Sequence, residues 1–502
     1  MSLKSLGAKI FAAITDRKTK KWATDPLGSQ DKVFKNLLKT AGGTAFAKAH
    51  SFSSIQTHKD FIQQVPVRDY EQLRPFVDRV VAGESDILWP GKPLYFAKTS
   101  GTTSGAKYIP LTKESMPEHI KAARNAILSY IHETGKAGFV DAKMIFLQGS
   151  PEMESKNGIR LGRLSGIVAH YVPNYLQKNR LPSMKTNCID DWETKVEAVI
   201  DETLPEKMSV ISGIPSWVQM YFERIVQRTG KKVGEVFPDF NLFIYGGVNF
   251  EPYRAKFDQL IGRQVDSIEL FPASEGFFAY QDKQNEKGML LLLDAGIFYE
   301  FIPANQFHEE HPPRLSIGEV EIGINYVMII STTAGLWAYN IGDTIAFTST
   351  SPYKIVVTGR IKHYISASGE HVIGKEVEEA MKAASTPLSI IINEFTVAPQ
   401  LSPEKDALPY HEWFVEFGTT ADLDLPKLSQ VLDLKMREQN SYYDDLITGK
   451  ILQPLKLTAV PENGFKVYMK TIGKLGGQNK LPRLSNDRKI AEVLEKIIQQ
   501  KA

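Results

Sequence analysis

The sequence predicts an α/β protein of two domains, and three stretches of its 502 residues carry that prediction. Strand-like and helix-like segments alternate from about Lys143 to Leu270, as is typical of a large α/β domain. Short β-rich runs follow one another from about Leu290 to Val357 and predict a β-subdomain. After Gly359, strand and helix patterns alternate again, so we expect a smaller α+β domain there.

We place the large domain at residues 1–358 and the small domain at 359–502, because a chain of this length exceeds what one hydrophobic core supports. The first hundred residues read as mostly helical, in short segments separated by Pro66 and Pro75. A helix follows Thr112, a candidate N-cap, and stops at Gly135. Further strands are expected at 143–147, 208–211, 242–245, 265–270, 364–365, 390–392 and 413–417, and further helices at 217–227, 253–260 and 374–384.

The composition bears on partners and compartment. Sixty Lys and Arg residues against 58 Asp and Glu give a formal net charge of +2, which gives no support for a nucleic-acid or membrane-surface partner. No apolar run approaches the ~20 residues of a membrane span. The segment from Ser2 to Lys21 is basic and mildly amphipathic but has no clear cleavage site. The single cysteine, Cys188, excludes an internal disulfide, and we expect a cytoplasmic protein.

A run of hydroxyl and glycine residues from Thr99 to Lys107 is the most informative motif. Glycines let a backbone turn tightly and expose N–H groups, which suits the phosphate tail of a nucleotide. The spacing differs from a Walker A loop, because only three residues separate Gly101 from Gly105 and Tyr108 follows the lysine. The sequence thus argues against a P-loop NTPase, and a plain surface loop remains the alternative.

Two further motifs follow predicted strands of the large domain. Tyr245-Gly246-Gly247-Val248 is either a strand-ending turn or a flat floor for a planar base. Phe271-Pro272-Ala273-Ser274-Glu275-Gly276 combines an aromatic ring, a hydroxyl and a carboxylate, which have the chemistry to stack a base, bind a phosphate oxygen and hold Mg²⁺. The alternative is a helix N-terminus with Ser274 as N-cap and Glu275 next to it.

Two more motifs supply a second carboxylate and a lysine near the C-terminus. In Trp337-Ala338-Tyr339-Asn340-Ile341-Gly342-Asp343, the carboxylate of Asp343 has the chemistry to accept both ribose hydroxyls. A β-turn at Gly342-Asp343 is the alternative. Gly476-Gly477-Gln478-Asn479-Lys480-Leu481-Pro482-Arg483 places Lys480 after a Gly-rich approach, where it is either a point charge for phosphate or a solvated lysine.

The order of these motifs, with Gly359-Arg360 before the last of them, resembles the adenylate-forming superfamily of acyl-CoA synthetases, luciferases and nonribosomal peptide synthetase adenylation domains. Within it, the chain is similar to the Gretchen Hagen family, the auxin-responsive acyl acid-amido synthetases of plants and their bacterial relatives. The resemblance rests on Thr99 to Pro110, Phe271 to Glu275, Tyr339 to Asp343 and Gly477 to Arg483. It implies a large adenylate-forming N-terminal domain of several subdomains and a small, mobile α+β C-terminal domain.

The resemblance also implies a role for each motif. Glu275 would ligate Mg²⁺, Lys480 would enter from the small domain to stabilise the adenylation transition state, and Lys362 would sit at the hinge. The ATP-binding residues would be Ser100, Gly101, Thr102, Thr103, Ser104 and Lys107 around the triphosphate, Gly246, Gly247 and Phe271 at the adenine, Ser274 at the α-phosphate, and Asp343 with Arg360 at the ribose.

This chain departs from the family pattern at two positions. Asn340 stands where the family commonly has Arg, which puts any role of that arginine in doubt. Phe271 stands where the family often has Tyr, which keeps the stacking surface and loses only a hydroxyl.

The resemblance implies an ATP-dependent ligase that activates a carboxylic acid as an acyl-adenylate and conjugates it to an amino acid, releasing AMP and pyrophosphate. An acyl-CoA ligase and a non-catalytic acyl-acid-binding protein are the alternatives. We expect the walls of the acid pocket in Gly158 to Tyr175 and around Ile214 to Trp217, with Arg160 and Arg163 as candidate partners of a carboxylate. Neither the acid nor the amino acid is identified by the sequence.

Overall fold

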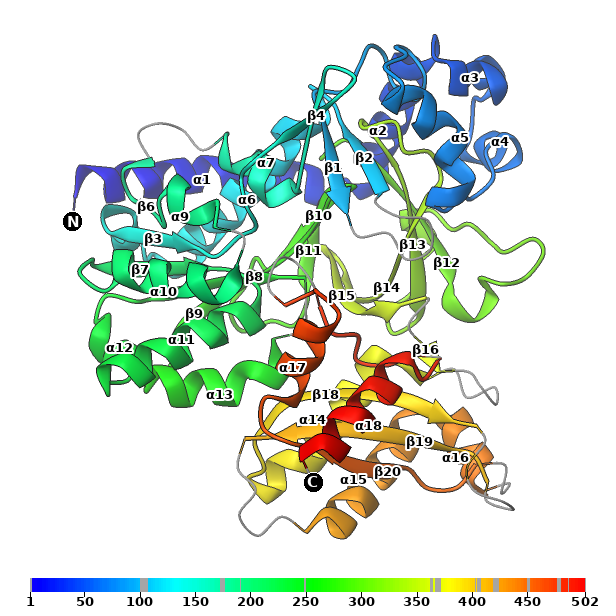
Figure 1. Ribbon diagram of the computed structural model, residues 1–502. Coiled ribbons are helices and arrows are strands. Elements are labelled where there is room, and N and C mark those ends of the chain that lie inside the picture. Colours follow the sequence, from blue (N-terminus) through cyan, green and yellow to red (C-terminus); the bar gives the residue numbers. More distant parts are fainter. Residues whose placement is uncertain are drawn as a thin grey trace. The chain divides into compact units, whose positions relative to one another are not determined.

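The computed structural model of the chain divides into two compact units (Figure 1). The first comprises Met1–Gly247 and Gln264–Val356, and the second comprises Val248–Arg263 and Val357–Ala502. The structure describes residues 2–501 apart from 100–106, 172–176, 190, 248–249, 362–363, 366–371, 402, 404–407, 419–423, 449–451, 476–479 and 486. None of the helices in this described part is long and apolar enough to cross a bilayer.

The first unit opens with helices, as the sequence predicts. These are α1 (Leu3–Ala23), α2 (Pro26–Ala41), α3 (Ala45–Ala49), α4 (His58–Gln64) and α5 (Tyr70–Val81). The expectation that Pro75 separates two segments is wrong, because α5 continues through it. A capping box between Asp69 and Gln72 begins this helix, and residues such as Leu73 and Val77 bury its inner face. This burial outweighs the one backbone hydrogen bond that proline removes.

A mixed sheet of eleven strands forms the centre of the first unit. Its order is β12 (Ile297–Pro303), β13 (Asn325–Thr332), β14 (Tyr339–Thr350), β15 (Tyr353–Arg360), β11 (Met289–Leu291), β10 (Gly276–Tyr280), β9 (Asp266–Ala273), β8 (Leu242–Gly246), β7 (Met208–Ser212), β3 (Lys143–Phe146) and β6 (Arg180–Leu181). Strands β6, β3, β7, β8 and β9 are parallel neighbours. The strands of 290–357 do not form a sheet of their own, because β11 pairs with β10 and continues the parallel part.

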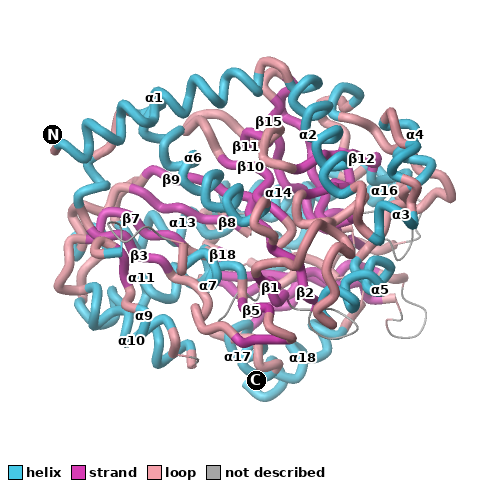
Figure 2. Tube along the Cα trace, turned by 90° about the horizontal axis from the view of Figure 1, so that it is seen from above, coloured by secondary structure: helices cyan, strands magenta, loops and turns pink. Residues whose placement is uncertain are grey.

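Helices α6 (Ser115–Thr134), α10 (Trp192–Thr203), α11 (Pro215–Thr229) and α12 (Val233–Val236) belong to the same α/β part. Helix α6 begins and ends close to the expected bounds, but its N-cap is Glu114 and not the predicted Thr112. Thr112 Oγ1 accepts a hydrogen bond from the Ser115 N–H at 3.0 Å, and Gly135 ends the helix at φ 70°. Residues of α6 such as Ala126 share a buried cluster with Ile244 of β8 and Ile268 of β9, which fixes the helix on the sheet. Helix α1 packs along the outer side of α6 (Figure 2).

A small second sheet in the first unit has the order β2 (Lys107–Leu111), β1 (Tyr95–Thr99), β5 (Ile159–Gly162) and β4 (Glu154–Lys156). Strands β1 and β2 are antiparallel, and Thr99 lies opposite Lys107 in their register. The predicted phosphate loop therefore connects the two arms of a β-hairpin.

The second unit is built on the sheet β18 (Ile392–Gln400), β19 (Tyr410–Phe417) and β20 (Lys456–Val460). Successive residues of β19 face opposite sides, as the period of a strand requires. Trp413 packs in the cluster that holds α14 (Gly374–Ser385) and α15 (Leu425–Gln439). Phe414 packs in the cluster that holds α17 (Gly464–Thr471) and α18 (Lys489–Lys501).

Three more elements complete the second unit. Helix α13 (Glu251–Ile261) packs on β18, and α16 (Ser441–Thr448) follows α15. Strands β16 (Tyr364–Ile365) and β17 (Val372–Ile373) form an antiparallel pair. The expected strand at 390–392 begins only at Ile392, because Thr386–Leu388 form a 3₁₀ turn ahead of it.

Candidate nucleotide and acyl acid site

The hydroxyl-rich loop is held where it enters β2. Ser100 to Ser104 lie outside the described residues, so their predicted phosphate contacts stay a prediction. The hydroxyl of Tyr70, on α5, accepts a hydrogen bond from the Tyr108 N–H at 2.9 Å, and the Lys107 Nζ lies 5.4 Å from the centre of the Tyr70 ring. These contacts fix the second arm of the hairpin against α5.

Gly246 and Gly247 end β8 at the carboxyl edge of the parallel strands, where ligands bind in open α/β sheets. A Cβ atom at Gly246 would lie 2.5 Å from the Leu270 carbonyl oxygen of the neighbouring strand. Gly247 has φ 84°, which favours glycine. Packing against the neighbouring strand thus accounts for Gly246, and the backbone conformation accounts for Gly247. That the two glycines lie beside an adenine stays a prediction.

Phe271, Ser274 and Glu275 lie on one β-hairpin. The alternative of a helix N-terminus at Ser274 is wrong, because Ala273 pairs with Gly276 and leaves Ser274-Glu275 as a two-residue turn between β9 and β10. Both turn residues are half-buried. The Phe271 ring is buried and meets the Phe278 ring edge to face, with 5.0 Å between the ring centres. Stacking of Phe271 on a base stays a prediction.

A magnesium ion fits the donor chemistry of this turn. Among the described residues no group of three or more His, Cys, Asp and Glu side chains is arranged to hold a metal ion. Mg²⁺ needs no such protein cage, because it is commonly held by one or two carboxylates together with substrate phosphates and water. The carboxylate of Glu275 would therefore suffice as a protein ligand if a nucleotide brought Mg²⁺ to this turn, and that role stays a prediction.

Asp343 lies in a bulge of β14. The register pairs Val327 with Thr344 and Ile329 with Asn340, so three residues of β14 stand opposite one of β13. The alternative of a plain β-turn is thus wrong, because Gly342 at φ 85° bends a strand that continues on both sides. Asp343 is 8% exposed, so the bulge buries most of its carboxylate.

The bulge also explains Asn340, which replaces the arginine common in the family. Its side-chain Oδ1 accepts a hydrogen bond from the Gly342 N–H at 2.8 Å. Its backbone N–H donates to the Arg68 carbonyl at 2.8 Å, and the Arg68 N–H donates to the Ala338 carbonyl at 3.0 Å. Asn340 therefore holds the backbone that presents Asp343.

The remaining predicted nucleotide residues belong to the second unit. Arg360 is the exposed last residue of β15, and Lys362 lies outside the described residues. Lys480 is exposed, and the segment after it pairs with β18. Within that segment the Thr396 hydroxyl donates to the Pro482 carbonyl at 2.7 Å, and the Val397 N–H donates to the Arg483 carbonyl at 2.9 Å.

Arg483 is the centre of a buried charge cluster that sequence reasoning did not assign. Its guanidinium donates to Glu378 at 3.1 Å, to Glu394 and to the Phe395 carbonyl at 3.1 Å. The Tyr253 hydroxyl lies 3.3 Å from the guanidinium and donates to Glu394 at 3.1 Å. Burial lowers the pKa of Arg483, but the surrounding carboxylates outweigh burial and raise it. The arginine is therefore a permanent cation.

A second group of residues lies where the sequence predicts the acid pocket. A Cβ atom at Gly149, just beyond β3, would lie 3.0 Å from the Arg163 Cδ and 3.5 Å from the Ser165 hydroxyl. Lys195 Nζ donates to the carbonyls of Gln148 at 3.1 Å and Asn187 at 2.7 Å. Among the described residues, Gln148 Nε2 beside Gly149 and Ser165 Oγ are buried without a hydrogen-bond partner, as are Asn187 Oδ1, Trp192 Nε1 and Gln219 Oε1.

An unpaired buried polar atom is destabilising by about 1–3 kcal/mol, so Gln148 Nε2 and Ser165 Oγ, beside Gly149, are candidate partners of a polar ligand. The sequence analysis names Arg163, which the structure places beside Gly149, but does not name Gln148. The sequence does hold an indication of Gln148, because this polar residue stands two positions beyond the end of the predicted strand Lys143–Phe146.

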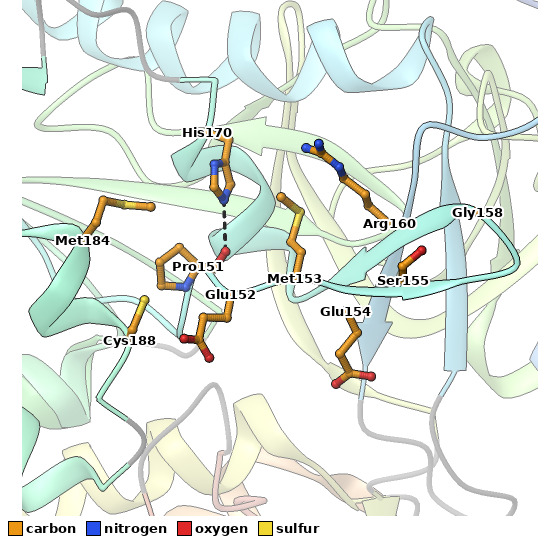
Figure 3. A pocket seen from close by; sticks show the side chains of 10 residues that line it. All are labelled: Pro151, Glu152, Met153, Glu154, Ser155, Gly158, Arg160, His170, Met184 and Cys188. Carbon is orange, nitrogen blue, oxygen red and sulfur yellow. Dashed lines mark hydrogen bonds between the residues drawn. The ribbon is translucent and has the colours of Figure 1, made fainter.

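An open cavity of about 560 Å³ adjoins the predicted acid region (Figure 3). Gly158, Arg160 and His170, from the first stretch expected to wall the acid pocket, line this cavity, and Ile214 to Trp217 do not. That the acid binds here stays a prediction. Its other lining residues are Pro151, Glu152, Met153, Glu154, Ser155, Met184 and Cys188. The His170 Nε2 donates to the Pro151 carbonyl at 3.0 Å, which fixes the ring at the rim. Burial raises the pKa of the Cys188 thiol, so this residue is no reactive thiolate.

Comparison with known proteins covers nearly the whole chain. Family models match residues 17–187 as the GH3 family N-terminal domain, 290–360 as its central domain and 375–489 as its C-terminal domain. Indole-3-acetic acid-amido synthetase GH3.3 of Arabidopsis thaliana is 20% identical over 93% of this chain and 90% of that protein. Jasmonoyl--L-amino acid synthetase JAR4 of Nicotiana attenuata is 20% identical over 63% of this chain and 66% of that protein, just under two thirds of its length.

Solved structures show the same architecture. The AtGH3.15 acyl acid amido synthetase in complex with 2,4-DB matches with a TM-score of 0.79 and 16% identity over 97% of this chain and 96% of that one. A 2-hydroxyisobutyryl-CoA ligase in the postadenylation state with 2-HIB-AMP matches with a TM-score of 0.58 and 13% identity over 94% of this chain and 91% of that one. With all three family domains matched in order, this chain belongs to the GH3 family.

Proposed function

We propose that this chain is an ATP-dependent acyl acid-amido synthetase, which activates a carboxylic acid as an acyl-adenylate and joins it to an amino acid. The observation that carries the proposal is the match to all three GH3 domains, since the relatives named above are amido synthetases. The motifs predicted from the sequence occur within or between these matched segments.

The chemistry requires activation because hydroxide is a poor leaving group. A carboxylate oxygen of the acid attacks the α-phosphorus of ATP, the bond to the bridging oxygen breaks, and pyrophosphate leaves. The amine of the amino acid then attacks the acyl carbon, the bond from that carbon to the AMP oxygen breaks, and AMP leaves with its electron pair while the nitrogen gives up a proton to solvent. Negative charge on the phosphates is the main barrier to the first step, so fixed charges contribute most.

We assign this electrostatic work to Lys480 and Glu275. The ammonium of Lys480 would stabilise charge on the phosphates during adenylation. Glu275 would hold Mg²⁺, which when bound neutralises phosphate charge. Asp343 would orient the ribose, with Arg360, and Ser274 would contact the α-phosphate.

We place the acid at the carboxyl ends of β3 and β7. The unpaired Gln148 Nε2 and Ser165 Oγ there are a donor and a hydroxyl that suit a polar group of the acid. Arg163 stands next to them beside Gly149 and would attract the carboxylate. The open cavity beside Arg160 would admit the acid or the amine from solvent.

Acid-dependent exchange of pyrophosphate into ATP, with hydroxylamine trapping of the adenylate across a panel of acids, tests the proposal. We expect Lys480→Ala to slow exchange by about a hundredfold, as removal of one preorganised charge typically does. Lys489→Ala is the matched control, since its side chain is 86% exposed on α18. Wild-type exchange in Lys480→Ala would refute the role of Lys480, and no exchange with any acid would favour the non-catalytic alternative.

The acceptor requires a separate test because an acyl-CoA ligase shares the first step. The likeness to 2-hydroxyisobutyryl-CoA ligase, at a TM-score of 0.58, is weaker than the likeness to AtGH3.15. Mass spectrometry after incubation with the activated acid, a mixture of amino acids and coenzyme A distinguishes the two. We expect an amide and no thioester, and the reverse result would make the chain a CoA ligase.

A further inference from the structure

Helix α1 presents an apolar row to solvent. Leu3, Leu6, Ile10 and Ile14 follow one another at steps of three or four residues, which places them on one side of the helix. They are 89%, 48%, 57% and 44% exposed, respectively. We call these four residues the α1 stripe.

The α1 stripe lies on the side of the helix that points away from the fold. On the inner side, Ala8 and Ala12 pack in the cluster that holds α6, and the Ser5 hydroxyl donates to the Ala137 carbonyl at 2.7 Å. Figure 2 shows α1 at the margin of the first unit with α6 beside it. The helix is therefore anchored through small residues, while its large aliphatic residues face outward. Contiguous exposed apolar patches of this kind mark interaction sites.

Basic side chains flank the stripe on both sides. At about 100° per residue, Lys9 and Lys20 lie roughly 80–100° to one side of it and Lys18 about 80° to the other. Arg17 and Lys21 lie on the same side of the helix as the stripe, beyond its last residue Ile14. Basic side chains therefore flank the stripe on both sides and at its C-terminal end.

The charge of the helix differs sharply from that of the whole chain. Lys4, Lys9, Arg17, Lys18, Lys20 and Lys21 stand against Asp16 alone, a net charge of +5. The carboxylate of Asp16 already lies 2.8 Å from Lys20 Nζ and 3.3 Å from His132 Nε2. Since the full chain carries +2, everything outside α1 carries −3. The near balance of the whole sequence thus conceals a strongly basic helix.

We propose that α1 docks the protein on an anionic lipid surface, with the α1 stripe in the boundary between headgroups and acyl chains. Lysine side chains beside the stripe have the length to keep their ammonium groups at the phosphates while their stems cover apolar surface. A second copy of α1 is disfavoured as the partner of the stripe, because the net charges of +5 on the two helices would repel each other. The same charge orients the protein, since an anionic surface attracts α1 and repels the remainder.

Sedimentation of the full chain with lipid vesicles tests this inference independently of any enzymatic activity. We expect binding to vesicles in which about a third of the lipid is phosphatidylserine, weak binding to pure phosphatidylcholine, and loss of binding at high salt. The variant Ile10→Gln/Ile14→Gln should bind at least tenfold more weakly. Leu434→Gln is the matched control, because Leu434 is a 56% exposed leucine on α15.

Each remaining outcome decides the question. Equal binding to both vesicles would refute the electrostatic part, and unchanged binding of Ile10→Gln/Ile14→Gln would refute the stripe. Self-association that this variant abolishes, without vesicle binding, would assign the stripe to a second copy and overturn the proposal. If the double variant melts at a lower temperature than the wild type, the single variant Leu3→Gln, at an 89% exposed position, repeats the comparison.

Discussion

Replacement of Arg483 by methionine should destabilise the second unit more than any surface change. The Arg483 side chain is 12% exposed, and the side chains of Glu378 and Glu394 beside it are 13% and 17% exposed. Its central carbon also lies 4.7 Å from the centre of the Phe395 ring. Arg483→Met keeps much of this packing but leaves two enclosed carboxylates without their cation.

The expected size of the effect follows from that burial. Removal of one partner of a buried ion pair is destabilising by about 3–5 kcal/mol, because the other charge is left uncompensated. At 1.4 kcal/mol per tenfold change, the open fraction of the second unit should rise by a factor of roughly 100 to 4,000. Exposed ion pairs contribute far less, since water already solvates both groups.

Hydrogen exchange measured by mass spectrometry reads this effect by segment. Amides of β18 and β19 should exchange faster by that factor in Arg483→Met, whereas amides of β8 in the first unit should not change. Lys435→Met is the matched control, because Lys435 pairs with Glu438 on the surface of α15 with 34% and 59% of the side chains exposed. We expect wild-type exchange in that control.

Two results would refute the reasoning. Unchanged exchange of β18 and β19 in Arg483→Met would mean that the guanidinium does not compensate the carboxylates. An equal effect of Lys435→Met would mean that the loss is not specific to the buried cluster.

Three further predictions concern the first unit. Burial lowers the pKa of His119 from 6.5 to about 4, so the free energy of unfolding of the wild type should fall by roughly 3 kcal/mol as the pH is lowered from 6.5 to 4. Urea titrations of His119→Leu should not show this loss. Burial raises the pKa of Glu300, but Arg314 and His58 together outweigh burial and lower the net pKa. The stability that Glu300 contributes is therefore present above the ordinary carboxyl pKa and is lost in more acidic solution. Glu300→Gln should therefore be less stable by about 3–5 kcal/mol at pH 7 and show a shallower decline in acid, and equal slopes would contradict this. Gly246→Ala should be less stable by about 1–3 kcal/mol, because its methyl would lie 2.5 Å from the Leu270 carbonyl, and it should raise KM for ATP more than KM for the acid.

Elements with a strong local pattern could be predicted from the sequence. The strands β3, β7 and β8 are compact apolar runs, and α6 begins and ends within a few residues of the predicted cap Thr112 and stop Gly135. Local chemistry decides such features, because the residues that determine them are neighbours in the chain.

Features that depend on pairing between distant residues could not be predicted. Ser274-Glu275 has the residue types of a helix start, but the pairing of β9 with β10 makes it a hairpin turn. Gly342-Asp343 reads as a turn, but pairing of β14 with β13 on both sides makes it a bulge. The buried partners of Arg483 come from three separate segments, α13, α14 and β18, so no residue near Arg483 in the sequence indicates them.

The placement of α13 has a consequence for how this chain can be divided. Its residues lie between β8 and β9 in the sequence, yet Val248–Arg263 belong to the compact second unit. The backbone therefore passes from one unit to the other three times, and a single cut after Val356 does not separate them. A fragment that begins at Val357 would lack Tyr253, so its Glu394 would lose a hydrogen-bond donor and β18 its covering helix. Any exchange of C-terminal parts between members of the family has to carry this helix along with them.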